Sequence, residues 1–518
     1  TIYVASDPDH ARSAIAEHDG RFRPVFVTSQ RDISRILTRD FGLTLTDRAV
    51  FDLQRNMPES SAATRLSRAQ MFWLAGIFLV AAIGLAFAPW HIFAALNIAV
   101  GIAFLGVAVM RYASIFVGLL SPRTAEERAY SNHGVPPDSD LPVYTIMVPL
   151  FREASVLPIL ARSLNELDYP ASKLDIKLIL EESDRDTLEA AKALRLPDHF
   201  EFIIVPTSLP QTKPKACNFA LPFARGEYLV IYDAEDCPEP KQLKKAVAAF
   251  NLGDEKLACV QAQLNYYNWN ENWLTRQFAI EYSAFFDLLL PMMVRLGLPI
   301  PLGGTSTHFR TSVLRKAGAW DPNNVTEDAD LGIRLARHGY RTELLDTVTL
   351  EEANCRVLPW IRQRSRWLKG YAMTYAVHMR DPVLLWRQLG AWRFFGFQVL
   401  FLGTLIQFLL APILWSFWLM LFGLGHPLAE ALPGSALIAI AALFLVAEVT
   451  NLAINLSALG ARDHRFLRPW TISLHFYFPL AAFAAYKGCW EMILSPFYWD
   501  KTAHGVHDET SQPAAVKA

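Results

Sequence analysis

The stretch Tyr228–Asp236 reads YLVIYDAED, an apolar run followed at once by a cluster of carboxylates. The run Tyr228–Tyr232 is short and uncharged, which is typical of a strand buried in the middle of a sheet. Asp233, Glu235 and Asp236 are therefore expected just beyond the carboxyl end of that strand. An apolar strand that ends in carboxylates predicts an α/β domain with a polar site at one edge of its sheet.

The same kind of apolar run occurs three more times upstream, with helical stretches after each run. Strands are predicted at Val143–Leu150, Lys173–Leu180 and Glu201–Val205, and helices at Val156–Leu167, Thr187–Leu194 and Lys215–Phe223. Strands that alternate with helices predict a parallel sheet covered on both faces. Ligands of such sheets bind beyond the carboxyl ends of the strands.

Carboxylates also follow the strand Lys173–Leu180, where Glu181, Glu182 and Asp184 come directly after it. Because parallel strands end at one edge of a sheet, the two acidic clusters are expected to meet there. Carboxylate oxygens suit Mg²⁺ or Mn²⁺, which in turn bind phosphate oxygens. The alternative is that these acids only cap the following helices. Their presence after two separate strands favours the metal–phosphate site.

Three later segments carry further polar groups. Thr326–Asp330 (TEDAD) opens a predicted helix, where the acids either complement the helix dipole or serve chemistry. Gly303–Ser306 (GGTS) reads as a turn that allows close backbone approach. Gln363–Trp367 (QRSRW) lies in a stretch dense in aromatic and cationic residues, which also fits an amphipathic helix at a membrane surface.

Two apolar blocks flank this predicted domain. Met71–Trp90 and His91–Met110 are uncharged runs of membrane-spanning length, joined by a tight connection, and predict a hairpin in a bilayer. A buried hairpin of a soluble core is the alternative. Arginines outside both ends, including Arg68 and Arg123, predict a cytoplasmic location for the ends of the hairpin.

The second block is harder to divide into spans. Phe394–Gly425 is uncharged but too long for one straight helix, so a tilted span with a re-entrant piece or a kinked hairpin is expected. Ala436–Ala458 predicts a further span, and Thr471–Trp490 either spans the bilayer or lies in its interface. The sequence thus predicts four to six spans, with the segment between the two blocks facing the cytoplasm.

Composition narrows the function further. The formal net charge of −1 gives no indication of a nucleic-acid partner. The five cysteines are scattered, without the spacing of a zinc site or a disulfide framework.

Taken in order, the motifs resemble the membrane-integrated family 2 glycosyltransferases, which include the cellulose and hyaluronan synthases. The resemblance runs from about Val143 to Trp367, with membrane segments on both sides. Each motif alone is weak, and their order makes the resemblance specific. The motifs are VPxxxE (Val148, Pro149, Glu153), an acidic strand end, Lys215 with Asn218, the DxD-like Asp233–Asp236, TED (Thr326–Asp328) and QxxRW (Gln363–Trp367).

This resemblance implies a GT-A type nucleotide-sugar domain, inserted between the transmembrane blocks, that inverts the anomeric carbon. It implies Asp328, beside Glu327, as the general base. The other roles it implies are nucleotide-sugar binding by Pro149, Glu153, Glu181, Glu182, Asp184, Lys215 and Asp233; Mg²⁺ or Mn²⁺ binding by Asp233 with Glu235 or Asp236; and acceptor or diphosphate contacts by Gly304, Thr305, Gln363, Arg366 and Trp367.

Three functions fit these motifs. The first is a processive synthase that transfers a hexose, UDP-linked by expectation, to an exopolysaccharide and exports the polymer through its own helices. The second is a transferase that adds one sugar to a lipid. The third, a non-catalytic sugar-binding protein, would be expected to lack the carboxylates that this sequence retains. A glutamate replaces the usual aspartate at the acidic strand end, so the sugar is not carried over from the family.

The expected organisation is a multi-pass protein of the inner (plasma) membrane. Residues 1–66 form a small, mainly helical cytoplasmic module with short helices at Arg31–Phe41 and Thr46–Leu53. It resembles the N-terminal modules of secretion ATPases, some of which bind cyclic di-GMP, and packing or oligomerisation is the alternative. Beyond it, the expected units are a transmembrane hairpin (67–121), the GT-A domain (122–358), interfacial helices (359–393), a second transmembrane block (394–492) and a tail (493–518). The end of this tail, Asp508–Ala518, is polar and predicted to be disordered. An export partner is expected for transfer across a second membrane.

Overall fold

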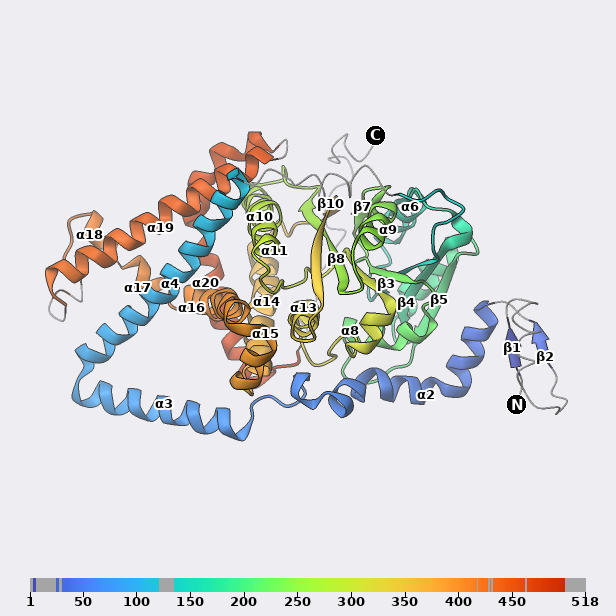
Figure 1. The fold of residues 1–518 in the computed structure, drawn as a ribbon, viewed down its shortest axis with the longest axis horizontal. Helices are drawn as coiled ribbons and strands as arrows, with labels where there is room; N and C mark the ends of the chain where they lie inside the picture. Colours follow the sequence, from blue (N-terminus) through green and yellow to red (C-terminus); the bar gives the residue numbers. More distant parts are fainter. Residues whose placement is uncertain are drawn as a thin grey trace.

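The computed structural model describes residues 3–5, 25–27, 30–120, 135–416, 418–426, 429, 432–461 and 464–498. Arg123, residues 1–2, 6–24 and 28–29 of the module proposed to bind cyclic di-GMP, and the tail beyond residue 498 lie outside the described residues. A sheet with its covering helices forms one part of the molecule, and long helices extend from it to one side (Figure 1).

The sheet has eight strands in the order β5-β4-β3-β6-β9-β8-β10-β7. The four predicted strands are present and adjacent in this order, and they pair in parallel. The sheet as a whole is mixed rather than parallel, because β9 runs antiparallel to both of its neighbours and β7 runs antiparallel to β10. The strands are β3 Tyr144–Leu150, β4 Leu174–Glu181, β5 Phe200–Val205, β6 Tyr228–Ile231, β7 Cys237–Pro238, β8 Leu257–Tyr266, β9 Thr307–Arg310 and β10 Arg341–Glu351.

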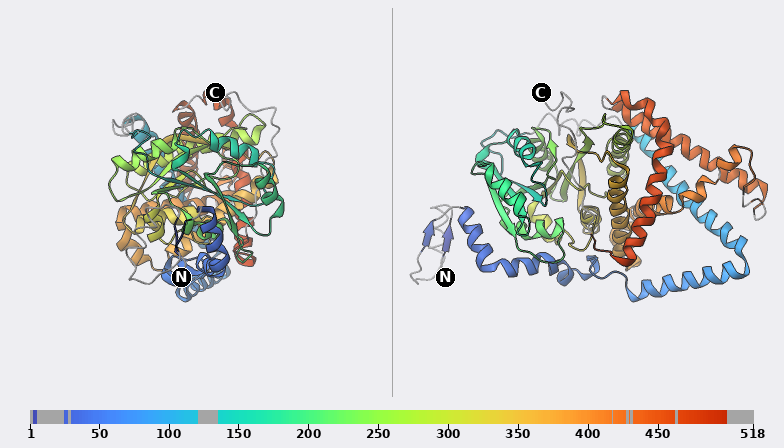
Figure 2. Two further views of the ribbon diagram at one scale, coloured as in Figure 1. Left: turned by 90° about the vertical axis from the view of Figure 1, so that its right-hand side faces the viewer. Right: turned by 180° about the vertical axis from the view of Figure 1, so that it is seen from behind.

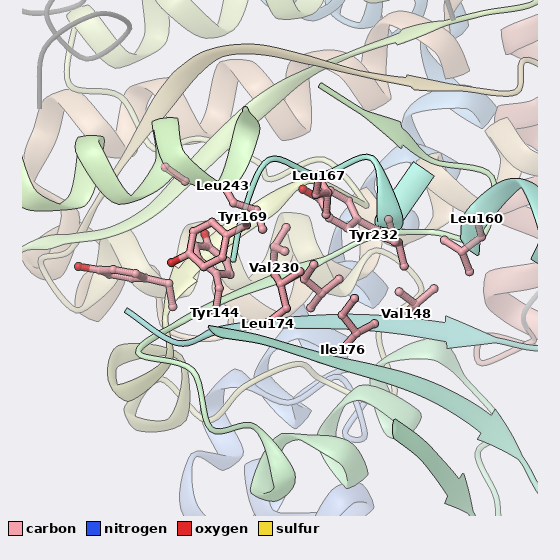
Figure 3. Packing of buried hydrophobic residues seen from close by; sticks show 14 of the residues in the cluster. Tyr144, Val148, Leu160, Leu167, Tyr169, Leu174, Ile176, Val230, Tyr232 and Leu243 are labelled. Atoms are coloured by element: carbon pink, nitrogen blue, oxygen red, sulfur yellow. The ribbon is translucent and has the colours of Figure 1, made fainter. Parts of the chain in front are cut away.

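Alternation along β3 divides its side chains between two hydrophobic cores. Tyr144 and Val148 belong to the core shown in Figure 3, whereas Met147 belongs to the core on the other face. Each fully buried side chain of this size contributes about 1.5–3 kcal/mol to folding. The first core is closed by helices α6 (Leu157–Asn165), α7 (Arg185–Ala193) and α9 (Gln242–Leu252), and the second by α8 (Lys213–Ala220), α12 (Thr311–Lys316) and α13 (Glu327–Arg337).

The amino-terminal region contains one long helix, α2 (Gln30–Asn56), in place of the two short helices predicted there. Gly42 lies inside α2 without interrupting it, since one glycine costs a helix only about 1 kcal/mol. The last part of α2 packs on the sheet domain, where Ala49 and Leu53 are buried. Short strands β1 (Tyr3–Ala5) and β2 (Val25–Val27) pair in parallel beyond its other end (Figure 1).

Five helical stretches in the described part of the chain are long and apolar enough to cross a membrane, by length and composition. Two of them, α3 and α4, form the predicted hairpin, and α19 packs along α4 (Figure 2). The stretch Trp273–Arg295 was not predicted to be a helix of membrane-spanning length. The five stretches are Arg68–Phe87 (α3); Pro89–Val117, within α4 (Pro89–Leu120); Trp273–Arg295, made of α10 (Trp273–Ala284), η4 (Phe285–Leu289) and α11 (Leu290–Arg295); Pro382–Leu409, made of α15 (Pro382–Phe397), η5 (Gln398–Gly403) and α16 (Thr404–Leu409); and Gly434–Gly460, within α19 (Gly434–Ala461).

The segment Phe394–Gly425, expected to be a tilted span with a re-entrant piece or a kinked hairpin, is divided into several helices. A π-helical turn, η5 (Gln398–Gly403), interrupts its first helix, which ends at Leu409. Two short helices follow, α17 (Ala411–Trp415) and α18 (Trp418–Leu421). The chain continues after α19 (Gly434–Ala461) through η7 (Arg465–Ser473) into α20 (Leu474–Leu494), which packs against α14 (Val357–His378).

Candidate active site

A cavity of about 490 Å³ lies beyond the carboxyl ends of β3, β4 and β6 and continues between the long helices. Most of the residues that the sequence singled out line this cavity, although they come from distant parts of the chain. The lining includes Pro149 and Glu153 after β3, Glu181 at the end of β4, Asp233 and Glu235 after β6, Gly304 and Thr305 before β9, Glu327 and Asp328 on α13, and Gln363, Arg366 and Trp367 on α14.

Asp236 lies behind the cavity and holds the acidic loop in place. It is fully buried, and its carboxylate accepts hydrogen bonds from the Asp233 backbone N–H at 2.7 Å and from the Thr305 hydroxyl. Burial, with the negative charge of Asp233 nearby, raises the pKa of Asp236 well above its ordinary value. Asp233 and Glu235 are thus the two acids of this loop that reach the cavity.

These two carboxylates fit a Mg²⁺ or Mn²⁺ ion only if the substrate supplies further ligands. No group of three or more His, Cys, Asp or Glu side chains within the described residues is arranged to hold a metal. A magnesium ion in such sites is commonly held by one or two carboxylates together with substrate phosphates and water. The donor set of Asp233 and Glu235 is of that kind.

Lys213 is a cavity residue that the sequence analysis missed. Its Nζ lies 2.5 Å from Oδ1 of Asp233 and donates to the Gly304 carbonyl at 2.6 Å. Burial acts to lower the pKa of Lys213, but the carboxylates of Asp233, Asp328 and Glu327 outweigh it and raise that pKa, so the ammonium is retained. The site therefore contains a fixed positive charge among its acids.

Lys215, which was predicted to approach a diphosphate, lies on another side of α8. Its Nζ is fully buried and pairs with Oε1 of Glu181 at 3.0 Å. The lysine orients a carboxylate that itself lines the cavity. Lys215 thus contacts the predicted nucleotide site through Glu181 rather than directly.

The other two acids after β4 lie outside the cavity lining. Asp184 caps α7 by accepting from the Thr187 N–H at 3.3 Å, and it also accepts from the Arg152 N–H. Glu182 is exposed and accepts from the Thr207 N–H at 3.2 Å. The helix cap, which the sequence pattern also allowed, is therefore the contact seen at Asp184.

Asp328 lies in the first turn of α13, with its carboxylate held between a donor and the cavity. The Trp320 indole N–H donates to Oδ1 at 3.2 Å. Burial, together with the charge of Glu327, raises the pKa of Asp328 well above its ordinary value. Burial also raises the pKa of Glu327, against the effect of Lys213. A buried carboxyl with a raised pKa at a cavity wall suits a general base.

Helix α14 supplies the remaining wall. Gly370 allows α14 to approach the start of α13 closely, because a Cβ at this position would collide with Thr326. Gln363 accepts from the Asn354 amide at 2.9 Å, and Trp367 lies with its ring 4.9 Å from the Arg364 guanidinium. A tryptophan face in a cavity wall suits the apolar face of a sugar ring.

Arg364 anchors this wall to two other helices and was also missed. Its guanidinium pairs with Glu281 of α10 and donates to the Tyr477 hydroxyl of α20 at 3.1 Å. Tyr477 in turn donates to Glu281 at 2.6 Å. Because Glu281 and Tyr477 hold the Arg364 guanidinium, its contact with the Trp367 ring helps to keep that ring at the cavity wall.

Polar side chains continue along the cavity into the membrane-length helices. Arg111 of α4 donates to the Asn451 amide oxygen of α19 at 3.0 Å, and both line the cavity. Polar groups inside such helices are costly and usually serve function. Ser114, Thr404, Gln407 and Asn455 also line this end, together with apolar side chains such as Val399 and Phe408.

Comparison with known proteins agrees with this geometry. Residues 228–432 match the family model described as "Glycosyl transferase family group 2". This stretch includes the acidic loop, Asp328 and the QxxRW segment. Over this region the chain matches the family 2 glycosyltransferases, and the predicted α/β fold of GT-A type is confirmed.

Several curated proteins are similar over part of their length. The probable glycosyltransferase YdaM of Bacillus subtilis is 27% identical over 239 residues, which cover 45% of this chain and 56% of that protein. The beta-monoglucosyldiacylglycerol synthase of Trichormus variabilis is 28% identical over 239 residues, 45% of this chain and 50% of that protein. The chain thus spans about half the length of these two relatives.

A plant relative is matched over a longer stretch. The probable glucomannan 4-beta-mannosyltransferase 1 of Arabidopsis thaliana is 22% identical over 395 residues, 71% of this chain and 68% of that protein. Among solved structures, the mannosyltransferase PcManGT of Pyrobaculum calidifontis, in complex with GDP-Man and Mn²⁺, aligns at 20% identity and a TM-score of 0.44. That alignment covers 76% of this chain and 99% of the other.

Proposed function

We propose that this protein is an inverting membrane glycosyltransferase that transfers a hexose from a nucleotide sugar, UDP-linked, to a growing polysaccharide. The observation that carries the proposal is the single cavity that joins Asp233 and Asp328 to polar residues between membrane-length helices. A donor binds at the sheet edge, and an acceptor reaches it from the helices. This arrangement favours a multi-pass location in the inner membrane, with the sheet domain in the cytoplasm.

The chemistry follows from the residues that line the cavity. Asp328 takes the proton of the acceptor hydroxyl as that oxygen attacks C1 of the sugar, and the bond from C1 to the diphosphate breaks. One displacement on C1 inverts its configuration. Lys213 and Arg366 offset the negative charge that develops on the leaving diphosphate. Trp367 stacks on the acceptor sugar.

A divalent cation fits beside these residues. Asp233 and Glu235 would hold Mg²⁺ or Mn²⁺, which when bound supplies further positive charge to the diphosphate. Asp236 holds the loop that carries both carboxylates, because it accepts hydrogen bonds from the Asp233 backbone N–H and from the Thr305 hydroxyl before β9.

A lipid acceptor is the second candidate. The helix end of the cavity includes apolar side chains beside the polar ones, among them Val107, Val399 and Phe408. Such a wall accommodates an acyl or prenyl chain as well as a glycan. The name of the Trichormus relative, a beta-monoglucosyldiacylglycerol synthase, points to the same acceptor class.

The test uses the purified full chain in nanodiscs. UDP-glucose, UDP-N-acetylglucosamine and GDP-mannose are supplied separately with Mn²⁺, and nucleotide release and product size are followed. A long product supports the synthase, and one sugar added to a lipid supports the second candidate. Absence of transfer from every donor would argue against both.

A matched pair of variants tests the base. Asp328→Asn is expected to lower turnover at least about 100-fold, since the amide cannot accept the proton. Asp186→Asn is the control, because Asp186 also lies in the first turn of a helix, α7, but is exposed and outside the cavity lining. Full activity in Asp328→Asn would remove that residue from the mechanism.

A further inference from the structure

The end of α2 lies against the loop that precedes α13. Asn218 of α8 stands between them: its side-chain amide donates to the Ala49 carbonyl at 3.1 Å and to the Trp320 carbonyl at 2.8 Å. The backbone N–H of Trp320 donates to the side-chain oxygen of Asn218 at 3.2 Å. One amide side chain therefore ties α2 to the backbone of Trp320.

Two further contacts join the same segments. The Asp321 carboxylate accepts from the Ala62 N–H at 2.5 Å and from the Ser61 hydroxyl at 3.5 Å. Gly318 has a φ of +79° and packs under Leu53, whose Cδ1 lies 2.7 Å from where a Cβ would be. Residues 49–62 thus contact the loop 318–321 directly at Gly318 and Asp321, and reach Trp320 through Asn218.

The other side of this loop reaches the cavity. The Trp320 side chain is only 1% exposed and packs edge-on against Phe309. Its indole N–H donates to Oδ1 of Asp328. The remaining oxygen, Oδ2, lies 3.9 Å from where a Cβ on Gly304 would be, so it faces the cavity wall at Gly304. Trp320 thus occupies one carboxylate oxygen and leaves the other toward the cavity.

We propose that residues 49–62 form a positioning element for Asp328, which acts through the loop 318–321 and the indole of Trp320. Trp320 and Leu53 are positioning residues, since neither lines the cavity. The inference rests on the proposed function, in which Asp328 is the base. It assigns to the amino-terminal segment a part in catalysis, beyond its packing on the sheet domain.

Positioning makes a specific demand on kinetics. A displacement of about 1 Å at a reacting group costs about 100-fold in rate, whereas donor binding at a separate part of the cavity is unaffected. Trp320→Phe keeps the aromatic ring but removes the N–H. We expect it to lower kcat about 10-fold or more, with the KM for the donor changed less than about twofold.

Leu53→Ala tests the amino-terminal segment itself. It opens space beneath Gly318 and is expected to lower kcat in the same direction, again with little change in donor KM. Leu43→Ala is the matched control, because Leu43 lies on the same helix and is 87% exposed, against 4% for Leu53. We expect wild-type kinetics from the control.

The experiment measures nucleotide release by the full chain in nanodiscs, with whichever of UDP-glucose, UDP-N-acetylglucosamine and GDP-mannose supports turnover. The double variant Leu53→Ala/Trp320→Phe is expected to lose less kcat than the product of the two single losses, since both act through one loop. Thermal unfolding of each variant identifies general loss of folding. Multiplicative losses, an unchanged kcat, or a parallel loss of donor binding would each overturn the inference.

The variant Asp328→Asn distinguishes failure of the proposed function from failure of the positioning role. If Asp328→Asn remains active, the base assignment in the proposed function fails. If Asp328→Asn is inactive while Trp320→Phe and Leu53→Ala behave as wild type, the proposed function stands and only the positioning role is overturned.

Discussion

Lys213 and Asp233 form an ion pair in the cavity wall, with 2.5 Å between Nζ and Oδ1. The two residues come from the start of α8 and from the loop after β6, which meet where the sheet ends. The ammonium also bonds the Gly304 carbonyl and therefore fixes the turn before β9. A positive charge is thus built into the acidic edge of the sheet.

Replacement of this lysine should weaken both donor binding and turnover. In Lys213→Met we expect the donor KM to rise about 10-fold and kcat to fall about 100-fold, since the leaving diphosphate loses a fixed cation. Steady-state nucleotide release gives both values. Lys241→Met, at an exposed position, is the control. Unchanged kinetics in Lys213→Met would show that the ion pair is only structural.

The two acids after Asp233 should differ in their effect on the metal requirement. Glu235→Gln is expected to raise the Mn²⁺ concentration for half-maximal activity about 10-fold, because a carboxylate at the cavity is lost. Asp236→Asn should raise this Mn²⁺ concentration less. It should lower the free energy of unfolding by about 1–2 kcal/mol, since a buried acceptor of two hydrogen bonds is altered. Titration with Mn²⁺ and thermal unfolding separate the two. The opposite order would place Asp236 at the metal.

Asp321 should make stability depend on pH. Burial raises the pKa of Asp321 to about 6. Between pH about 4 and 6 the folded protein retains a proton that the unfolded chain releases, so the free energy of unfolding falls as pH rises through this window, by about 3 kcal/mol in all. Asp321→Asn should lack this decline.

Thermal unfolding of wild type and Asp321→Asn at pH 4.5 and pH 7 checks the pH effect. The Tm of the variant relative to wild type should be higher at pH 7 than at pH 4.5. Asp186→Asn, at an exposed site, should show no such change. A difference between wild type and Asp321→Asn that is the same at both pH values would contradict the assignment.

The pair of Glu281 and Arg364 should matter for stability more than a surface pair. Arg364 is only 12% exposed, so Glu281→Gln leaves a mostly buried guanidinium without its counter-charge and should cost about 3 kcal/mol. Glu343 is as exposed as Glu281, but its partner Arg341 is 41% exposed, so Glu343→Gln should cost less than about 1 kcal/mol. Thermal unfolding in nanodiscs compares them. Equal losses would mean that the buried pair has no special role.

Local pattern predicted part of this molecule, and tertiary contacts decided the rest. The strands β3 to β6 were predicted because each is a short run rich in apolar and β-branched residues that ends close to polar residues, although β4 and β5 also contain charged residues such as Lys177 and Glu201. The antiparallel β9 was not, because its direction depends on the strands β6 and β8 on either side, which lie far away in sequence. Trp273–Arg295 escaped prediction as a membrane-length helix because charged residues such as Glu281 interrupt it.

The sequence predicted which segments form the site, but not every residue in it. Lys213 shows why. Lys213 and Lys215 are two positions apart on α8, which turns about 200° over two residues and so presents them to different surroundings. The motif named Lys215, which pairs with Glu181, whereas Lys213 reaches Asp233. Arg364 was missed for a different reason: its partners, Glu281 on α10 and Tyr477 on α20, are remote in the sequence.

The burial of Ala49 and Leu53 in the sheet domain has a practical consequence for anyone who shortens this protein. A version that starts at α3 would expose the apolar surface that Ala49 and Leu53 cover beside α8. It would also remove the hydrogen bond from the Ala62 N–H to Asp321. Such a product would be prone to aggregate and poor in activity for reasons unrelated to its catalytic residues. The shortest version expected to keep these contacts therefore begins within the second half of α2, well ahead of Val148, the first residue of the motifs.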